Sequence, residues 1–356
     1  MSRFLNEKYL PLEEYTPGEQ PQDKKYIKLN TNESPYPPSP KVIEAVTADE
    51  VKDLRLYCDP DCNKLKGAVA DLYGVKKENI FLSNGSDDIL NFAFMAYGSK
   101  GAVFADITYG FYSVFAQLHG VKAEIIPLND DFTLNLEAFK NKTGLVVIAN
   151  PNAPTGIALS LKEIEEIVCE NKDNVVLIDE AYVDFGGESC AVLTEKYPNL
   201  LCVQTFSKSR SLAGGRLGFA IAQKELIKDL EKIKYSTNPY NINRLTQIAG
   251  LATVLDDGYY KENCRKITNT RLWVTEQLET LGFKVLPSKA NFIFAESEKI
   301  SGQALYEKLK EKGVLIRHFT KDRISNFNRI TIGSQAEMET FIEKVKEILG
   351  DANENK

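Results

Sequence analysis

A lysine in an unusual setting is the first residue that could do chemistry. Lys208 lies in "QTFSKSRSLAGGRLGF", where it follows an apolar, strand-like run and precedes Arg216. A lysine becomes a nucleophile when burial and neighbouring groups lower its pKa, because the free amine can then attack a carbonyl. Ser207 could donate to a phosphate, and Arg216 could add a bidentate contact to the same group. These charges could also belong to an ordinary loop, so the pattern only suggests a phosphate-bearing aldehyde cofactor.

A carboxylate and a phenol follow a second apolar run, in "VLIDEAY". Asp179 at the end of this strand could keep the nitrogen of a pyridine ring protonated, which makes the ring an electron sink. Tyr182, three residues further on, could reach a hydroxyl group of the same ring. The alternative is that the Asp-Glu pair only caps the next turn.

The stretch "LSNGSDD" between a strand and a helix is a candidate phosphate site. Gly85, Ser86 and Asp87 would present backbone N–H groups at the positive end of the helix dipole. Ser86 could equally be a simple helix cap.

Two further strand ends carry residues suited to a flat ring. "NPNAPTG" forms a tight turn from which Asn152 could point back at the ring, and "DITYGFY" places Tyr109 where it could stack on it. Tyr109 could instead be part of the core. Together, the residues at these strand ends predict pyridoxal 5′-phosphate as the cofactor, because ligands of open α/β sheets bind outside the carboxyl ends of the strands.

The elements that must position these residues alternate between strands and helices from about Ile80 to Ile221. Short apolar runs such as "GLVVIAN" are apolar on both faces, which predicts a mostly parallel sheet covered by helices on both sides. Long amphipathic helices follow after residue 222, and then a smaller α+β unit in which "NFIFAES", "VLIRHF" and "NRITIG" are the expected strands. The proline-rich "NTNESPYPPSP" must be extended.

The expected fold class is therefore α/β, with a large mixed sheet, a smaller α+β domain and an N-terminal arm. We expect the arm at residues 1–28, the large cofactor-binding domain at 41–250, and the small domain at 29–40 and 251–356. A chain of 356 residues exceeds the size of one growing core, which also favours two lobes.

Composition narrows the class of protein. The net charge of -6 and the pI near 5.3 argue against binding nucleic acid or an anionic membrane. No apolar run is long enough for a membrane helix, and the N-terminal residues do not resemble a signal peptide, so we expect a cytoplasmic protein. Cys58 and Cys62 lack a second pair at zinc-site spacing, so we expect free thiols and no metal.

With these residues in place, the sequence resembles the fold-type I pyridoxal-phosphate enzymes of the aminotransferase class I/II family, over nearly its full length. Within the family it is most similar to the histidinol-phosphate branch. The motifs that carry the resemblance are "YTPGEQP", "KLNTNESPYPPSP", "RLYCDPD", "SNGSDD", "TYGFY", "NPNAPTG", "IDEAYVDF", "TFSKSRSLAGGRLG", "PYNINRLTQ", "NFIFAE" and "NRITIG".

The resemblance implies roles for individual residues. Lys208 would bond covalently to the cofactor, Asp179 would pair with the pyridine nitrogen, and Tyr182 would contact the phenolic oxygen. The remaining implied cofactor contacts are Tyr109, Ser86, Asp87, Ser207, Arg216 and, from the neighbouring subunit of a homodimer, Tyr57. The implied substrate contacts are Tyr15, Asn32, Arg317 and Arg329. The two arginines lie on expected strands of the small domain, where they could converge on one anion or simply face solvent.

One position departs from the family pattern. The residue immediately before "PTG" is usually an asparagine that bonds to the phenolic oxygen, whereas this chain has Ala153. Asn152 could take over this contact, or Tyr182 could make it alone.

The implied reaction is transamination of L-histidinol phosphate with 2-oxoglutarate, which yields imidazole-acetol phosphate and glutamate in histidine biosynthesis. A broad aromatic or aliphatic aminotransferase and a threonine-phosphate decarboxylase are the alternatives that share the site. A nicotinamide-dependent oxidoreductase would need a G-x-G-x-x-G motif, which "SNGSDD" does not provide.

Overall fold

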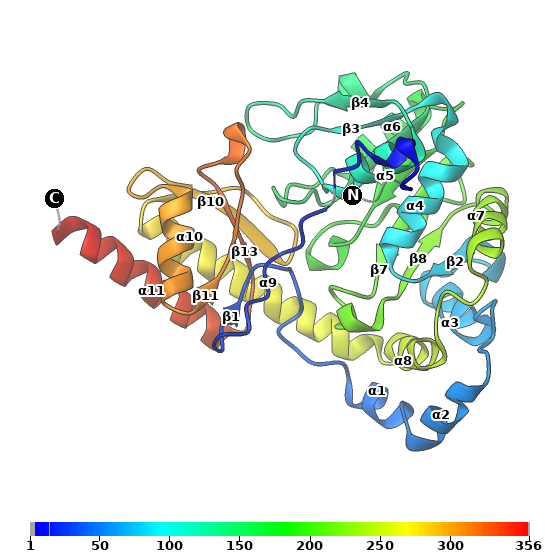
Figure 1. Cartoon of the computed structure of the whole chain (residues 1–356), viewed down its shortest axis with the longest axis horizontal. Coiled ribbons are helices and arrows are strands. Elements are labelled where there is room, and N and C mark those ends of the chain that lie inside the picture. Colours follow the sequence, from blue (N-terminus) through cyan, green and yellow to red (C-terminus); the bar gives the residue numbers. More distant parts are fainter. Residues whose placement is uncertain (1–3, 14, 355–356) are drawn as a thin grey trace.

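The apolar runs between residues 80 and 221 form one sheet in the computed structural model, which describes residues 4–13 and 15–354 (Figure 1). Its strand order is β2-β8-β7-β6-β5-β3-β4. Only β8 runs antiparallel to its neighbours β7 and β2, which confirms the expected mixed, mostly parallel sheet. The strands are β2 (Ile80–Ser83), β3 (Ala102–Ala105), β4 (Ala123–Ile126), β5 (Leu145–Ala149), β6 (Val176–Asp179), β7 (Leu200–Thr205) and β8 (Gly218–Ile221).

Helices cover both faces of this sheet because its strands are apolar on both sides. Successive residues of β6 show the alternation: Leu177 packs into one buried cluster and Ile178 into the other. The helices on the Leu177 side are α4 (Ser86–Tyr97), α5 (Phe111–His119) and α7 (Lys224–Thr237). The helices on the Ile178 side are α3 (Asn63–Tyr73), α6 (Leu161–Glu170) and α8 (Arg244–Leu255).

A second lobe contains a smaller antiparallel sheet of order β12-β13-β10-β9, seen on the left of Figure 1. Its strands are β9 (Phe283–Val285), β10 (Phe292–Ser297), β12 (Arg317–His318) and β13 (Asn328–Thr331). The helices of this part of the chain are α9 (Asp257–Thr280), α10 (Gly302–Glu311) and α11 (Gln335–Glu354), and α9 extends from this lobe toward the large one (Figure 1).

The expected single strand "VLIRHF" is divided into two, which corrects the prediction. Its first part, β11 (Val314–Leu315), pairs in parallel with β1 (Ile27–Lys28), whereas its second part, β12, pairs with β13. The β1–β11 ladder and the β12–β13 ladder belong to different sheets, so one continuous strand cannot take part in both. Because β1 lies at the end of the predicted arm, the last residues of the arm are attached to the small lobe.

A segment rich in exposed apolar side chains leads into the large lobe. It contains the short helices α1 (Pro40–Ala45) and α2 (Ala48–Lys52) and continues to Tyr57. Its exposed apolar residues are Ile43, Val51, Leu54, Leu56 and Tyr57.

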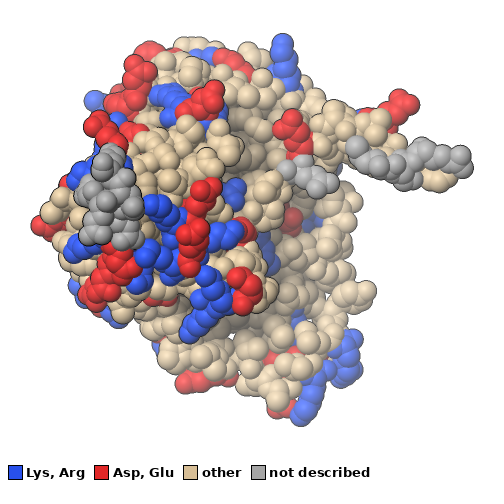
Figure 2. All heavy atoms as spheres, turned by 60° about the vertical axis from the view of Figure 1, so that its left-hand side comes forward, with Lys and Arg blue, Asp and Glu red and all other residues tan. Residues whose placement is uncertain are grey.

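The face shown in Figure 2 carries basic and acidic side chains interspersed rather than a patch of one sign. Among the described residues, no helix is both long and apolar enough to cross a membrane. The cysteines of the chain are free thiols.

Candidate active site

Most of the predicted site residues line one cavity of about 650 Å³. The carboxyl ends of β6 and β7 contribute to it, as do the start of α4 and strands β12 and β13 of the small lobe. The predicted residues that line it are Tyr15, Asn32, Ser86, Asp87, Tyr109, Asp179, Tyr182, Ser207, Lys208, Arg216, Arg317 and Arg329.

Lys208 is half-buried just after β7. Its Nζ donates a hydrogen bond to the carbonyl oxygen of Thr31 at 3.1 Å and lies 5.9 Å from the centre of the Tyr182 ring. Burial, together with the positive charge of Arg329, lowers the pKa of Lys208 to about 8. About a tenth of the amine is therefore uncharged at pH 7, and this is the form that a nucleophilic lysine requires.

Asp179 forms a buried carboxylate at the end of β6. It accepts hydrogen bonds from the hydroxyl of Tyr112 at 2.8 Å and from the backbone N–H of Ala181 at 3.2 Å. Burial raises the pKa of Asp179 to about 6, against the opposing effect of the Tyr112 hydrogen bond. A protonated ring nitrogen next to this carboxylate would relieve the cost of burying its charge.

The start of α4 forms a candidate anion-binding cradle. Gly85 precedes the helix with φ 84°, and an added Cβ would lie 2.8 Å from Nη2 of Arg216. An added Cβ at Gly218 would lie 2.4 Å from the backbone nitrogen of Ser86, so glycine allows the strand to approach the helix end closely. Backbone N–H groups, the helix dipole and the guanidinium group together suit a phosphate.

Asp87, at the start of α4, and Tyr109 are joined by a hydrogen bond. The Asp87 carboxylate accepts from Nη2 of Arg216 at 3.1 Å and from the Tyr109 hydroxyl at 2.9 Å. Because a carboxylate repels phosphate, the backbone N–H of Asp87 is the group that could serve a phosphate. Tyr109 also contacts the ring of Tyr15 edge-on at 6.4 Å, and Tyr15 stacks on Phe111 at 4.2 Å.

The small lobe places two arginines side by side on adjacent strands. Arg317 on β12 pairs in register with Arg329 on β13, so their side chains leave the same face of the sheet. Arg317 donates to the carbonyl oxygens of Pro17 and Thr16 at 3.3 and 3.4 Å, whereas Arg329 donates to that of Asn30 at 3.0 Å. Within the described residues, Nε of Arg329 is buried without a hydrogen-bond partner. Two adjacent like charges, one incompletely paired, indicate a site for an anion.

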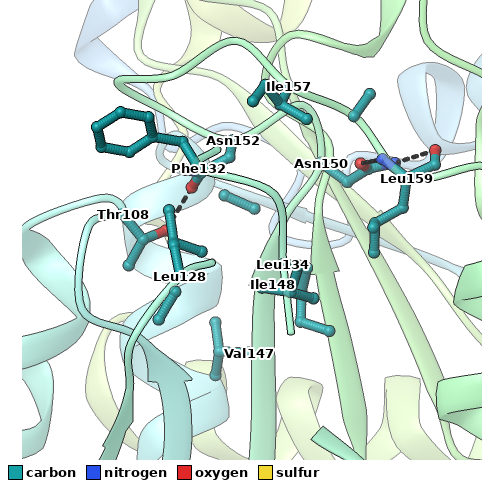
Figure 3. A pocket seen from close by; sticks show the side chains of 13 residues that line it. Thr108, Leu128, Phe132, Leu134, Val147, Ile148, Asn150, Asn152, Ile157 and Leu159 are labelled. Carbon is teal, nitrogen blue, oxygen red and sulfur yellow. Dashed lines mark hydrogen bonds between the residues drawn. The ribbon is translucent and has the colours of Figure 1, made fainter. Parts of the chain in front are cut away.

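Asn152 is not brought to the main cavity, contrary to the expectation that its amide faces a ring. Its Nδ2 donates to the carbonyl of Ile107 and to Thr155 Oγ1, both at 3.0 Å, and its Oδ1 accepts from Thr108 Oγ1 at 2.8 Å (Figure 3). The side chain instead borders a separate cavity of about 20 Å³. Local partners hold the amide away from the ring site.

Tyr57 also lies outside the cavity. It is 81% exposed and stacks on Tyr240 with ring centres 4.5 Å apart. Its implied role in the site of a neighbouring subunit stays a prediction.

Sequence reasoning missed two supports of the site. Tyr112, whose hydroxyl donates to Asp179, lies in the first turn of α5, and its position three residues after Tyr109 is the signal that could have revealed it. The carbonyl of Thr31, which accepts from Lys208, had no signal in the side-chain pattern.

The residues present fit pyridoxal phosphate. The site combines a lysine with a lowered pKa, a buried carboxylate, a phenol and a glycine-lined cradle beside an arginine. These are the groups needed for the aldehyde, the ring nitrogen, the phenolic oxygen and the phosphate, respectively.

Comparison with known proteins gives a consistent result. The family described as aminotransferase class I and II matches residues 24–345. The histidinol-phosphate aminotransferase of Brachyspira hyodysenteriae is 53% identical to this chain, over 98% of this chain and 99% of that protein.

Among solved structures, histidinol-phosphate aminotransferase from Sinorhizobium meliloti in complex with pyridoxal-5′-phosphate has a TM-score of 0.84 at 24% identity, with 92% of each chain covered. L-threonine-O-3-phosphate decarboxylase from Porphyromonas gingivalis has a TM-score of 0.79 at 21% identity, covering 91% of this chain and 99% of that one, and so shares the fold. The chain belongs to the aminotransferase class I and II family.

Proposed function

We propose that this chain is a pyridoxal-phosphate-dependent aminotransferase that converts L-histidinol phosphate and 2-oxoglutarate into imidazole-acetol phosphate and glutamate, a step of histidine biosynthesis. The 53% identity to a histidinol-phosphate aminotransferase over almost the whole chain supports this substrate. It favours histidinol phosphate over a broad aromatic or aliphatic donor.

The observation that carries the substrate class is the cross-strand pair of Arg317 and Arg329. Both guanidinium groups border the cavity that contains Lys208. A phosphate monoester carries close to two negative charges at neutral pH and accepts bidentate hydrogen bonds, so it matches two adjacent arginines. The carboxylates of 2-oxoglutarate could use the same donors in the second half-reaction.

Besides the covalent bond to Lys208 and the contact of Tyr182 with its phenolic oxygen, the cofactor would be held by this chain at its phosphate, its ring nitrogen and one ring face. Arg216, Ser207 and the backbone at the start of α4 would bind its phosphate, while Asp179 would keep its ring nitrogen protonated. When bound, pyridoxal phosphate carries the amino group and withdraws electrons from the α-carbon of the substrate. Tyr109 would cover one face of the ring.

Lys208 would act twice. It would hold the cofactor covalently between turnovers, and as a free amine it would move the proton at the substrate α-carbon. Its lowered pKa supports both roles, because only the uncharged amine can accept a proton. Tyr15 stacks on Phe111 and lines the cavity, where it would exclude water from the bound substrate.

We further propose a cytoplasmic homodimer. The exposed apolar side chains gathered between Ile43 and Tyr57 support a partner interface, because such surface is usually covered. Tyr57 would then reach the cofactor phosphate of the neighbouring subunit. The proposed organisation is an arm at residues 1–28, a large domain at 41–250 and a small domain at 29–40 and 251–356, with the end of the arm paired to the small domain through β1 and β11.

A donor panel tests the function directly. Enzyme loaded with cofactor would be given 2-oxoglutarate with histidinol phosphate, phenylalanine or threonine phosphate, and both glutamate and carbon dioxide would be measured. We expect histidinol phosphate to give the highest kcat/KM and no carbon dioxide. Equal use of phenylalanine would instead indicate a broad aminotransferase, and carbon dioxide from threonine phosphate a decarboxylase.

Two variants complete the design. Arg329→Ala should lose activity with the phosphorylated donor. Arg265→Ala, which removes an exposed arginine from α9, should behave like the unaltered enzyme.

A further inference from the structure

Asn32 is a buried residue whose backbone is held at both ends. It is 1% exposed and has a left-handed conformation with φ 57°. Its N–H donates to Oγ1 of Thr331 at 3.0 Å, and its carbonyl accepts from Nδ2 of Asn291 at 3.0 Å. Asparagine tolerates this backbone region better than most residues, so the position favours asparagine or aspartate.

The side-chain amide of Asn32 has one orientation that satisfies its neighbours. Thr331 is buried, its Oγ1 accepts from the backbone N–H of Asn32, and among the described residues the one acceptor found for its own hydrogen is Oδ1 of Asn32 at 2.9 Å. The amide nitrogen must then point the other way. It lies 3.0 Å from the hydroxyl oxygen of Tyr182, to which it donates.

This contact determines where the Tyr182 hydroxyl can donate. Because the oxygen accepts from Asn32, its hydrogen must point elsewhere. The ring of Tyr182 packs against Ala153, Ala290 and Phe292, which offer no side-chain acceptor. Within residues 4–13 and 15–354, no other hydrogen bond of this hydroxyl is found, and Tyr182 borders the main cavity. The hydrogen of the Tyr182 hydroxyl therefore points into the cavity.

We propose that Asn32 is a positioning residue that directs the Tyr182 hydroxyl hydrogen into the cavity, toward the phenolic oxygen of the cofactor. This inference rests on the function proposed above and on the contact with the phenolic oxygen that the family resemblance implies for Tyr182. It accounts for the alanine at position 153, since a correctly directed hydroxyl can serve the phenolic oxygen without a neighbouring amide. Because Thr331 lies two residues from Arg329 on β13, the strand that would bind the substrate anion also orients the hydroxyl.

Asn32→Asp is the decisive variant, because it preserves shape and backbone preference but reverses the hydrogen bond. One carboxylate oxygen would accept from Thr331 and the other from the Tyr182 hydroxyl, which turns the hydrogen away from the cofactor. A donor to the phenolic oxygen stabilises the deprotonated form of the cofactor, so its loss should raise the pH midpoint of the cofactor absorption change by roughly one to two pH units. Cofactor affinity should fall about tenfold or more.

A double-variant cycle separates hydrogen-bond direction from the added charge. Tyr182→Phe alone should raise the midpoint by a similar amount, and adding Asn32→Asp to it should change little further. If the aspartate acts only through its charge, the same shift will persist in the Tyr182→Phe background, and that result overturns the proposal. An unchanged midpoint in Asn32→Asp overturns it as well.

Two further variants keep the proposal testable if the Asn32→Asp protein does not fold. Thr331→Val removes the hydroxyl that fixes the amide, so it should give a smaller rise of the same sign. Ala153→Asn, which supplies a new donor, should partly reverse the effect of Asn32→Asp. All readouts come from absorption and cofactor titration without substrate, so a wrong substrate assignment leaves them unaffected. Failure of the unaltered protein to bind the cofactor would overturn both proposals.

Discussion

Replacing Lys208 by methionine should stabilise the cofactor-free protein at neutral pH. Burial and the nearby Arg329 lower the pKa of Lys208 from 10.5 to about 8 in the folded protein. One pKa unit corresponds to about 1.4 kcal/mol, so keeping this lysine protonated in the folded state at pH 7 costs about 3 kcal/mol. Methionine has a similar aliphatic length and carries no charge, so it should remove most of this cost.

The sign of the pH dependence follows from the same shift. The unfolded chain binds the Lys208 proton more tightly than the folded one, so the free energy of unfolding should rise with pH between about 8 and 10.5. The advantage of Lys208→Met should therefore shrink from about 3 kcal/mol at pH 7 to less than about 0.5 kcal/mol at pH 10.5.

Urea unfolding of the cofactor-free protein at both pH values measures this difference. Lys232→Met, which replaces an exposed lysine of α7, is the matched control and should change little at either pH. A neutral or destabilising Lys208→Met at pH 7, or a gain that does not depend on pH, would refute the reasoning. The same variant should lose the yellow colour and the label that borohydride reduction introduces.

Three further predictions concern the rest of the site. Arg317→Ala removes charge-assisted hydrogen bonds worth about 1.5–3 kcal/mol, so it should weaken histidinol phosphate by roughly ten- to a hundredfold, measured as KM, while unphosphorylated histidinol loses little; equal losses would indicate a structural role. If Tyr57 serves the neighbouring subunit, mixing inactive Tyr57→Ala and Lys208→Ala proteins should restore up to about a quarter of normal activity through hybrid dimers, and sedimentation should show a dimer; an active monomer contradicts this. Gly85→Ala places a methyl group 2.8 Å from Nη2 of Arg216, at a position whose backbone conformation is nearly reserved for glycine. Cofactor titration of this variant should show an affinity about tenfold lower. Unchanged affinity would mean that the cradle is not the phosphate site.

Local patterns in the sequence were sufficient for the elements of the large lobe and for the residues at their ends. Short runs that are apolar on both faces predict buried parallel strands, and the carboxyl ends of such strands meet at one edge. Lys208 after β7 and Asp179 at the end of β6 could therefore be predicted as neighbours, and both line the cavity. The functional roles of these residues stay predictions.

These local patterns did not predict the contacts between segments that are distant in the sequence. The run "VLIRHF" has the composition of one strand, but β1 and β13 each pair with part of it. Asn152 follows a strand as expected, yet its amide turns toward Ile107 and Thr108 from another strand end. In both cases the outcome depends on which partner arrives from elsewhere in the chain, and residue spacing contains no information on that.

The direction of hydrogen bonds was likewise decided by tertiary structure. The family resemblance implied a substrate contact for Asn32, but its amide is fixed by Thr331, which follows it by 299 residues in the chain. The register between β12 and β13 similarly determines that Arg317 and Arg329 face the same side. Residue types in the sequence determined which chemistry is available, whereas the packing of the two lobes determined where each donor points, because a hydrogen bond requires a partner at the right distance and angle.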